Sequence, residues 1–335
     1  MLKISVLLLP VLILGSCVSS PAVAPPPWSG NVNTVYPRGE YIAQKGEGGS
    51  KNDAETNALA NISRFFASEI TASEYSAYSS TSRNGIYDTT RQIDTDTLVQ
   101  SQTKLFAVNY AEDAWQNPGS KKWETVAYID RAEAWIIYEP EAQKQAAAFT
   151  ALFEAAENER DPLKRFFAYR AAERHTVNPA YITTMEFGQI LAPLQMNSVF
   201  AEVRASAATI PQKLNEAKKA ANIFVVVDTD NEGALNAALA KALGSEGFPV
   251  AKSRGGAAAI CTAAVTEGLQ KTDMGTFYFP KISITLRSAS GGDVFSFSIE
   301  AAKQGAMNPD IAKLRAYTAL AAAVEKQFSV ELNKE

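Results

Sequence analysis

Two aspartates at the end of an apolar run are the residues whose types and spacing come closest to metal or phosphate chemistry. Asp228 and Asp230 begin a calcium-type loop that keeps Gly233 at its sixth place. The twelfth place is Leu239 instead of the bidentate glutamate, and Glu232 stands where a phosphatase nucleophile motif has Thr or Val. We therefore interpret both carboxylates as caps of a helix N-terminus, with a metal-dependent hydrolase as a third hypothesis.

A glycine run over residues 46–49 joins a strand-like segment to a helical one, where helix N-terminal amides can bind phosphate. The details do not fit a phosphate loop. A Walker loop needs Gly-Lys followed by Ser or Thr, whereas Ser50 precedes Lys51, and Lys51 also occupies the place of the third glycine in the dinucleotide fingerprint. The run predicts a tight turn, and Ser50 with Asp53 is expected to cap the helix.

Metal and triad chemistry have few candidate residues. His175 is the only histidine, and it stands at the end of a predicted helix, where it can cap a carbonyl. Cys261 is far away in the sequence, so a zinc site would lack ligands. The Gly-x-Ser-x-Gly elbow of serine hydrolases is missing. The sequence predicts no catalytic residue, no metal site and no cofactor, and we expect a protein that is not an enzyme.

The N-terminus has the layout of a secretory signal peptide over residues 1–16. Lys3 precedes the apolar residues 4–14, which are too few to cross a bilayer. Leu14-Gly15-Ser16-Cys17 resembles a bacterial lipobox, which implies cleavage before Cys17 and acyl chains, palmitate among them, on that cysteine. Several chains give durable attachment, since each buried methylene adds about 0.8 kcal/mol. Val18, in place of the aspartate that retains lipoproteins at the inner membrane, indicates the outer membrane.

Composition limits the rest of the chain. Residues 17–335 suffice for two domains, and no later segment approaches membrane-spanning length, so we expect a soluble body outside the cytoplasm. Hydrophobic residues make up 46% of the chain, enough for a sizeable core. Cys261 has no partner for an intramolecular disulfide once Cys17 is acylated. The net charge of −4 gives no footprint for nucleic acid, and we exclude that partner.

The first predicted domain follows a tether. Residues 17–35 are rich in Pro and Ser and are predicted to form a tether, in which residues 18–34 give an extended spacer of up to roughly 50 Å. Trp28 in this segment can touch lipid headgroups or pack on the domain. Residues 36–139 are expected to form a β-α-β-β-α unit, with strands at 36–45, 98–110 and 123–129 and an apolar stripe of Ala54, Ala58, Ile62, Phe65, Phe66 and Ile70 on its first helix.

These residues resemble a family, the Lpp-twenty type of outer-membrane lipoprotein, related to the N-terminal domain of flagellar assembly protein T. The matching features are Tyr41-Ile42-Ala43, Gly46-Glu47-Gly48, the alanine-rich helix and Val126-Ala127-Tyr128-Ile129-Asp130-Arg131-Ala132. The resemblance covers about a third of the chain. It implies an envelope lipoprotein with no known catalytic residues, so none is carried over.

The remaining chain predicts a helical segment at 140–221 and a small α+β sandwich at 222–335. Pro140 is expected to break or kink the helix that starts near Asp130, and Pro193 and Pro211 to interrupt later helices. In the last domain, residues 223–227 predict a buried strand, a further strand is expected after Pro249, and residues 277–287 and 294–302 predict a hairpin. The fold class is α+β.

Three functions remain open. The first is a membrane-anchored, non-enzymatic envelope scaffold or assembly factor, whose partners are membrane lipid through Cys17 and envelope proteins. The second is a module that binds cell-wall glycan or a small ligand, with Tyr75, Tyr78 and Tyr87 as the candidate aromatic groove. The third is the hydrolase that uses Asp228 and Asp230. The sequence does not specify the oligomeric state or which face of the membrane carries the body.

Overall fold

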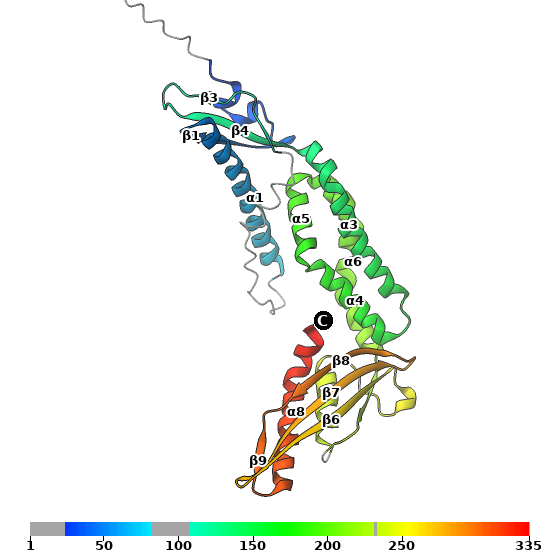
Figure 1. Ribbon diagram of the computed structural model, residues 1–335. Coiled ribbons are helices and arrows are strands. Elements are labelled where there is room, and N and C mark those ends of the chain that lie inside the picture. Colours follow the sequence, from blue (N-terminus) through cyan, green and yellow to red (C-terminus); the bar gives the residue numbers. More distant parts are fainter. Residues whose placement is uncertain (1–23, 82–107, 231–232, 335) are drawn as a thin grey trace, which may run out of the picture. The chain divides into compact units, whose positions relative to one another are not determined.

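The computed structural model describes residues 24–81, 108–230 and 233–334, and its α+β class confirms the prediction. The chain divides into two compact units (Figure 1). The first comprises Met1–Tyr138 with Ile190–Ala192, and the second comprises Glu139–Gln189 with Pro193–Glu335. The expected lipidation site Cys17 and most of the strand expected at 98–110 lie outside the described residues.

The first unit is built on an antiparallel sheet in which β4 (Trp123–Asp130) is central. β1 (Tyr41–Gly48) pairs along the whole of β4, and the short strands β2 (Asn109–Tyr110) and β3 (Trp115–Gln116) pair with it elsewhere. Successive side chains of a strand point to opposite faces, so the sheet has two surfaces to cover. Helix α1 (Lys51–Thr81) covers one of them (Figure 1).

Helix α1 packs on the sheet through the predicted stripe. Ala54, Ala58, Ile62 and Phe66 are fully buried, and Phe65 lies at the margin. The expected cap is confirmed: the Asp53 amide donates to the Ser50 hydroxyl at 3.1 Å, and the Ser50 amide donates to the Asp53 carboxylate at 3.1 Å. Two donors at the N-terminal end of the helix are thereby satisfied.

The glycine run has a different role from the predicted turn. Gly46 and Gly48 lie inside β1, and a Cβ on Gly46 would meet the Ala54 carbonyl oxygen and the Ala58 amide nitrogen at 2.2 Å each. The glycines therefore let the backbone of α1 approach the strand, and only Gly49 and Ser50 make the turn. Sequence alone does not separate these two uses of glycine.

The outer edge of β1 is occupied by α1 as well. Asn57 donates its side-chain amide to the Glu47 carbonyl at 2.8 Å, and Asn61 donates to the Lys45 carbonyl at 2.8 Å. The two asparagines are one helical turn apart, and the two carbonyls are two residues apart along the strand. Helix and strand thus match in spacing along this edge.

Pro193 begins a new helix as expected, the predicted interruption at Pro211 is wrong, and of the two effects expected at Pro140, a break or a kink, the break is wrong. Helix α3 (Arg131–Asn158) runs through Pro140, and α6 (Pro193–Ala220) runs through Pro211. Pro140 removes one hydrogen bond to the Ile136 carbonyl, but both residues are exposed, so water can satisfy that carbonyl. The expected boundary at residues 139 and 140 consequently falls within a continuous helix.

The second unit contains α4 (Pro162–Thr176), α5 (Pro179–Leu191), α6 and a five-stranded sheet with its own helices. β5 (Ile223–Val227) runs parallel to β6 (Ala259–Thr272), and β7 (Gly275–Ser288) and β8 (Asp293–Glu300) continue the sheet in antiparallel order. Strand β9 (Gln304–Ala306) pairs with the start of β7. The predicted hairpin is confirmed as β7 and β8, and the strand expected after Pro249, for which no bounds were predicted, corresponds to β6, which begins ten residues later.

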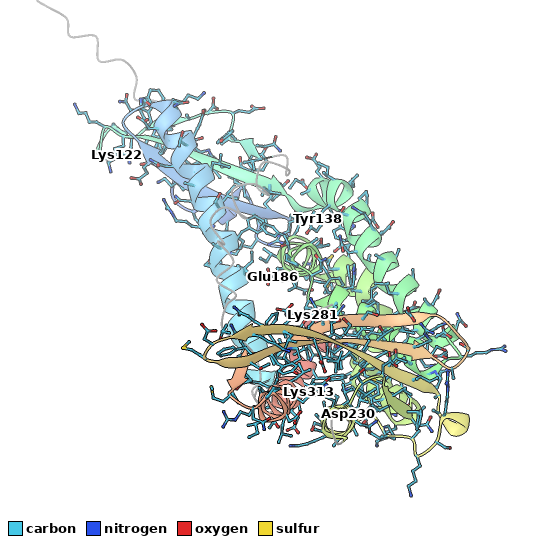
Figure 2. All side chains as sticks on the ribbon, turned by 60° about the horizontal axis from the view of Figure 1, so that its bottom comes forward. Lys122, Tyr138, Glu186, Asp230, Lys281 and Lys313 are labelled. Atoms are coloured by element: carbon cyan, nitrogen blue, oxygen red, sulfur yellow. The ribbon has the colours of Figure 1, made fainter. Side chains whose placement is uncertain are left out.

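Helices α7 (Ala234–Ser245) and α8 (Pro309–Lys334) cover one face of this sheet. The shared core includes Phe166, Phe248, Leu286, Tyr317 and Phe328. Figure 2 shows Lys281 on one side of the sheet and Lys313 and Asp230 on the other. The opposite face carries exposed polar pairs in register, with Lys281 opposite Glu300 and Ser283 opposite Ser298.

Candidate functional site

The segment that follows the predicted lipidation site is fixed to the first unit. Two short 3-10 turns, Pro27–Ser29 and Val32–Thr34, lie on the face of the sheet opposite α1. Trp28 is 4% exposed and packs against Ala111, Val126 and the partly buried Trp115. The prediction that residues 17–35 form a tether throughout is therefore wrong for its last part, because the indole buries its apolar surface on the sheet.

Three tyrosines extend this attachment. The Tyr36 ring stacks on Tyr128 with 4.5 Å between centroids, and Tyr41 meets both rings edge-on at 5.6 and 5.8 Å. Burial and the neighbouring tyrosines raise the pKa of Tyr36, so its hydroxyl stays neutral at physiological pH. Trp28 and Tyr36 hold the N-terminal segment on the sheet at two points.

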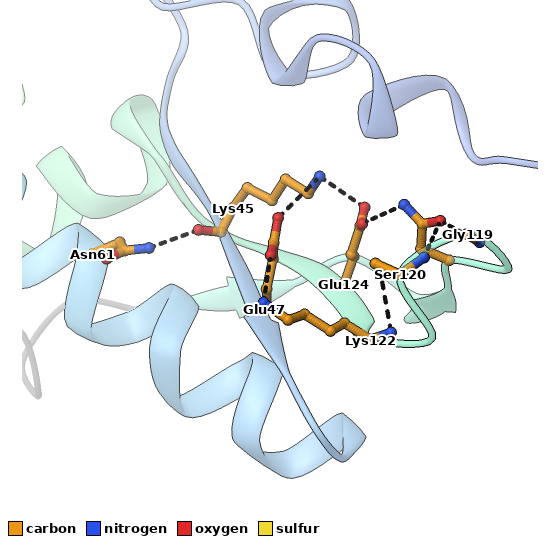
Figure 3. A network of polar contacts seen from close by, with 8 residues as sticks. Lys45, Glu47, Asn61, Gly119, Ser120, Lys122 and Glu124 are labelled. Atoms are coloured by element: carbon orange, nitrogen blue, oxygen red, sulfur yellow. Dashed lines mark hydrogen bonds and ion pairs between the residues drawn. The ribbon is translucent and has the colours of Figure 1, made fainter.

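A buried carboxylate lies on the same face (Figure 3). Glu124 is 3% exposed, and it accepts the Lys45 ammonium at 2.7 Å and the Asn117 side-chain amide at 2.8 Å. Lys45 and Lys122 also approach Glu47, at 3.8 and 3.6 Å. Because its partners come from two separate segments, Glu124 ties β1 and the turn at 117–120 to β4, and its charge is paired with Lys45.

Two similar clusters of tyrosine, glutamate and lysine lie in the second unit, and neither was predicted. Glu267 on β6 accepts the Tyr317 hydroxyl at 2.6 Å and the Lys313 ammonium at 2.8 Å. These donors hold the pKa of Glu267 below its ordinary value, while burial raises the pKa of Tyr317. About 50 residues separate glutamate and tyrosine in the sequence, so no local pattern reveals the cluster.

The second cluster joins α3, α4 and α6. Glu157 accepts the Tyr169 hydroxyl at 2.5 Å and the Lys213 ammonium at 2.9 Å. Both hydrogen bonds lower the pKa of Glu157, and burial with the glutamate raises that of Tyr169. In both clusters an ionised carboxylate and a neutral phenol lock two elements together, which is a structural arrangement.

The predicted aspartates are separated in role. The two Asp230 oxygens accept the backbone amides of Leu235 and Asn236 at 3.0 and 2.9 Å, so Asp230 caps the start of α7 as expected. Asp228 is exposed. Within the described parts of the chain, no group of three or more His, Cys, Asp and Glu side chains could hold a metal ion.

His175 and Cys261 both pack within the second unit, and each has different neighbours. The His175 ring lies 3.2 Å from the Gln145 carbonyl through Nε2 and meets the Tyr181 ring edge-on. The prediction placed this contact at the last carbonyls of the histidine's own helix, whereas the Gln145 carbonyl lies in the middle of helix α3. Cys261 is fully buried, and burial raises the pKa of its thiol to about 12. The side chains of Tyr75, Tyr78 and Tyr87 lie outside the described part.

No family model matches the sequence, and no curated protein matches it. The resemblance to the Lpp-twenty type and to flagellar assembly protein T therefore gains no support from these comparisons. Similar solved structures include two bacterial lipoproteins and a secreted protein. A minor lipoprotein of Acinetobacter baumannii is 7% identical with a TM-score of 0.24, and 33% of this chain and 86% of that chain are covered.

A lipoprotein of Neisseria meningitidis is 14% identical with a TM-score of 0.21, and 32% of this chain and 99% of that chain are covered. A secreted protein of Helicobacter pylori is 10% identical with a TM-score of 0.32, and 88% and 99% are covered. Scores this low assign neither a family nor a function to the chain. Among the residues that the structure describes, none of the helices has both the length and the apolar character needed to cross a bilayer.

Proposed function

We propose that this protein is an acylated lipoprotein of the bacterial cell envelope, attached to the outer membrane through Cys17, which acts as a non-enzymatic scaffold or assembly factor. The observation that carries the proposal is the docking of Trp28 on the first unit, eleven residues after the predicted acylation site. Acyl chains at Cys17 would then hold a folded body, with little free chain between them.

Chain geometry sets the reach of such an attachment. A fully extended chain spans at most about 3.6 Å per residue, so the docked indole lies within roughly 40 Å of the Cys17 backbone. The sequence alone predicted a spacer of up to roughly 50 Å from residues 18–34. The shorter reach keeps the first unit near the membrane, where it can meet partners held in the same membrane.

The arrangement of polar groups supports a scaffold over an enzyme. Glu124, Glu157 and Glu267 each accept two or more hydrogen bonds or ion pairs that join separate elements. Asp230 caps the start of α7, and this structural role accounts for its carboxylate. A metal-dependent hydrolase would lose activity on chelation and in Asp228→Asn, and the scaffold proposal expects neither treatment to alter partner binding.

Mass spectrometry of membrane-fraction protein tests the attachment directly. We expect the wild type to begin at Cys17 with acyl chains, and Cys17→Ser to leave the membrane fraction. Cys261→Ala is the matched control, because a buried thiol has no access to the acylation machinery. An unmodified wild-type protein outside the membrane fraction would overturn the anchor.

Crosslinking in intact cells tests the scaffold part. Envelope proteins captured by the wild type and lost in Cys17→Ser, with both proteins folded and equally abundant, would support a membrane-held assembly factor. Capture of the same proteins by both would show that the partners do not depend on the anchor. Absence of any envelope partner would refute the scaffold.

A further inference from the structure

Large apolar side chains gather at one end of the second unit, around the turn between β6 and β7. Met274 in this turn is 78% exposed, and Met307 after β9 is 76% exposed. We call the group the hairpin-tip patch; its members are Leu269, Met274, Met307, Ile311 and Leu314, each at least 46% exposed. Isolated exposed apolar residues are ordinary, but a group of five on neighbouring segments marks an interaction surface.

Strand pairing brings these residues together from three segments. β9 pairs with the start of β7, with Ala306 opposite Thr276. Gly275 lies so close to β9 that a Cβ there would be 2.5 Å from the Ala306 carbonyl oxygen and 3.2 Å from the Met307 amide nitrogen. Met274 directly precedes Gly275 and Met307 directly follows Ala306, so the two methionines stand on neighbouring backbone segments. Ile311 and Leu314, three residues apart in the first turns of α8, share one exposed side of the helix.

Cationic side chains surround the patch. Lys271, Lys303 and Arg315 lie in these segments, and in the described part of the chain none of the three forms an ion pair. Lys303 lies over the Phe277 ring at 4.5 Å, which keeps its ammonium beside the apolar surface. Residues 267–279 and 301–316 contain four basic and three acidic side chains, with Lys313 paired to Glu267, which gives a net charge of +1 in a chain whose total is −4.

The hairpin-tip patch lies at the end of the β6–β7 hairpin, which projects from the sheet of the second unit. Figure 1 shows the β6–β7 turn and β9 at the end of the second sheet, beside the start of α8. Peptides and helices are bound in grooves or along sheet edges, whereas a projecting apolar end with cations around it suits the headgroup region of a bilayer. Anionic lipid also attracts clustered lysines and arginines.

We propose that the hairpin-tip patch binds the surface of an anionic bilayer, with the two methionines among the acyl chains and Lys271, Lys303 and Arg315 at the phosphates. This contact is separate from acylation and would give the protein a second attachment to lipid. The acyl chains expected at Cys17 would hold the protein at the membrane, and the patch would orient the second unit toward the lipid surface.

Co-sedimentation with vesicles tests the proposal, and the full mature chain with Cys17→Ser is used so that acyl chains play no part. We expect binding to vesicles of phosphatidylglycerol and phosphatidylethanolamine, and much weaker binding to vesicles of phosphatidylcholine. Met274→Ser combined with Met307→Ser should lower the partition coefficient at least tenfold. Leu194→Ser is the matched control, because Leu194 is 80% exposed on α6, outside the patch, and should leave binding unchanged.

Several outcomes would overturn the proposal. The proposal is wrong if the unacylated chain does not sediment with anionic vesicles. It is also wrong if the double methionine variant binds these vesicles as well as the parent chain does. A dimer that forms in solution and dissociates in the double variant would assign the patch to a second copy of the chain instead. Lys271→Ala with Lys303→Ala should remove the preference for anionic lipid while the thermal midpoint stays unchanged, which separates lost contact from lost folding.

Discussion

Replacement of Gly46 by alanine should destabilise the first unit far more than the same change at Gly49. A Cβ at Gly46 would lie 2.2 Å from the Ala54 carbonyl oxygen and from the Ala58 amide nitrogen, where ordinary contact begins at 3.4 Å. Strand and helix would have to separate by about 1 Å, and backbone cannot move aside as a flexible side chain can. Overpacking of this kind costs about 1 to 3 kcal/mol, and we expect the upper end.

Gly49 supplies the matched control, because its nearest contact would be the Asp53 carboxylate at 3.8 Å. We expect Gly49→Ala to change the free energy of unfolding by less than about 1 kcal/mol. Urea denaturation followed by tryptophan fluorescence measures both variants, since Trp28, Trp115 and Trp123 lie in this unit. Equal stability of the two variants would refute the close approach of α1 to β1.

Four further changes test other parts of the structure. Thr125→Val should stabilise the protein by about 1 kcal/mol in urea denaturation, because the buried hydroxyl has no hydrogen-bond partner among the described residues. Asp230→Ala should cost about 1 to 2 kcal/mol by removing the cap of α7, and exposed Asp228→Ala should cost much less; a reversed order by the same assay would contradict the capping role. Cys261 should resist a soluble thiol reagent at pH 8 until the protein is unfolded, and rapid labelling of the folded protein would disprove its burial. The pKa of Glu267 lies below its ordinary value of 4.5, so its ionised form contributes stability above that pH, which is lost as the pH falls through the lowered pKa. Thermal midpoints between pH 7 and 3 should therefore fall more steeply for the wild type than for Glu267→Gln.

Elements with a regular hydrophobic pattern were predictable from the sequence. The stripe of α1 and the alternation in β7 and β8 each report which face is buried, and the cap at Ser50 follows from two residues three positions apart. The extent of β6 was not predicted, because its outer half contains Glu267, Gly268, Gln270 and Lys271, a composition typical of a loop. Its length is set by pairing with β7, a tertiary effect.

Contacts between distant segments were beyond local patterns. The docking of Trp28 needs a sheet face that forms from residues about 100 positions later, and Glu124 finds Lys45 only when β1 and β4 pair. The prolines at 140 and 211 were assigned their average effect, whereas solvent at the exposed side of a helix reduces it. The role of Asp230 was predictable because its partners are only five and six residues away.

The hydrogen bonds from Asn57 and Asn61 to the edge of β1 affect whether neighbouring molecules can aggregate at high concentration. An unprotected sheet edge can pair with the same edge of a neighbouring molecule and seed fibrils, and the risk rises with local concentration. Under the attachment proposed above, the molecules would be confined to a membrane surface and would reach a high local concentration. With the Lys45 and Glu47 carbonyls already occupied, a second chain finds fewer acceptors at this edge, so crowding should not convert the first unit into a template for aggregation.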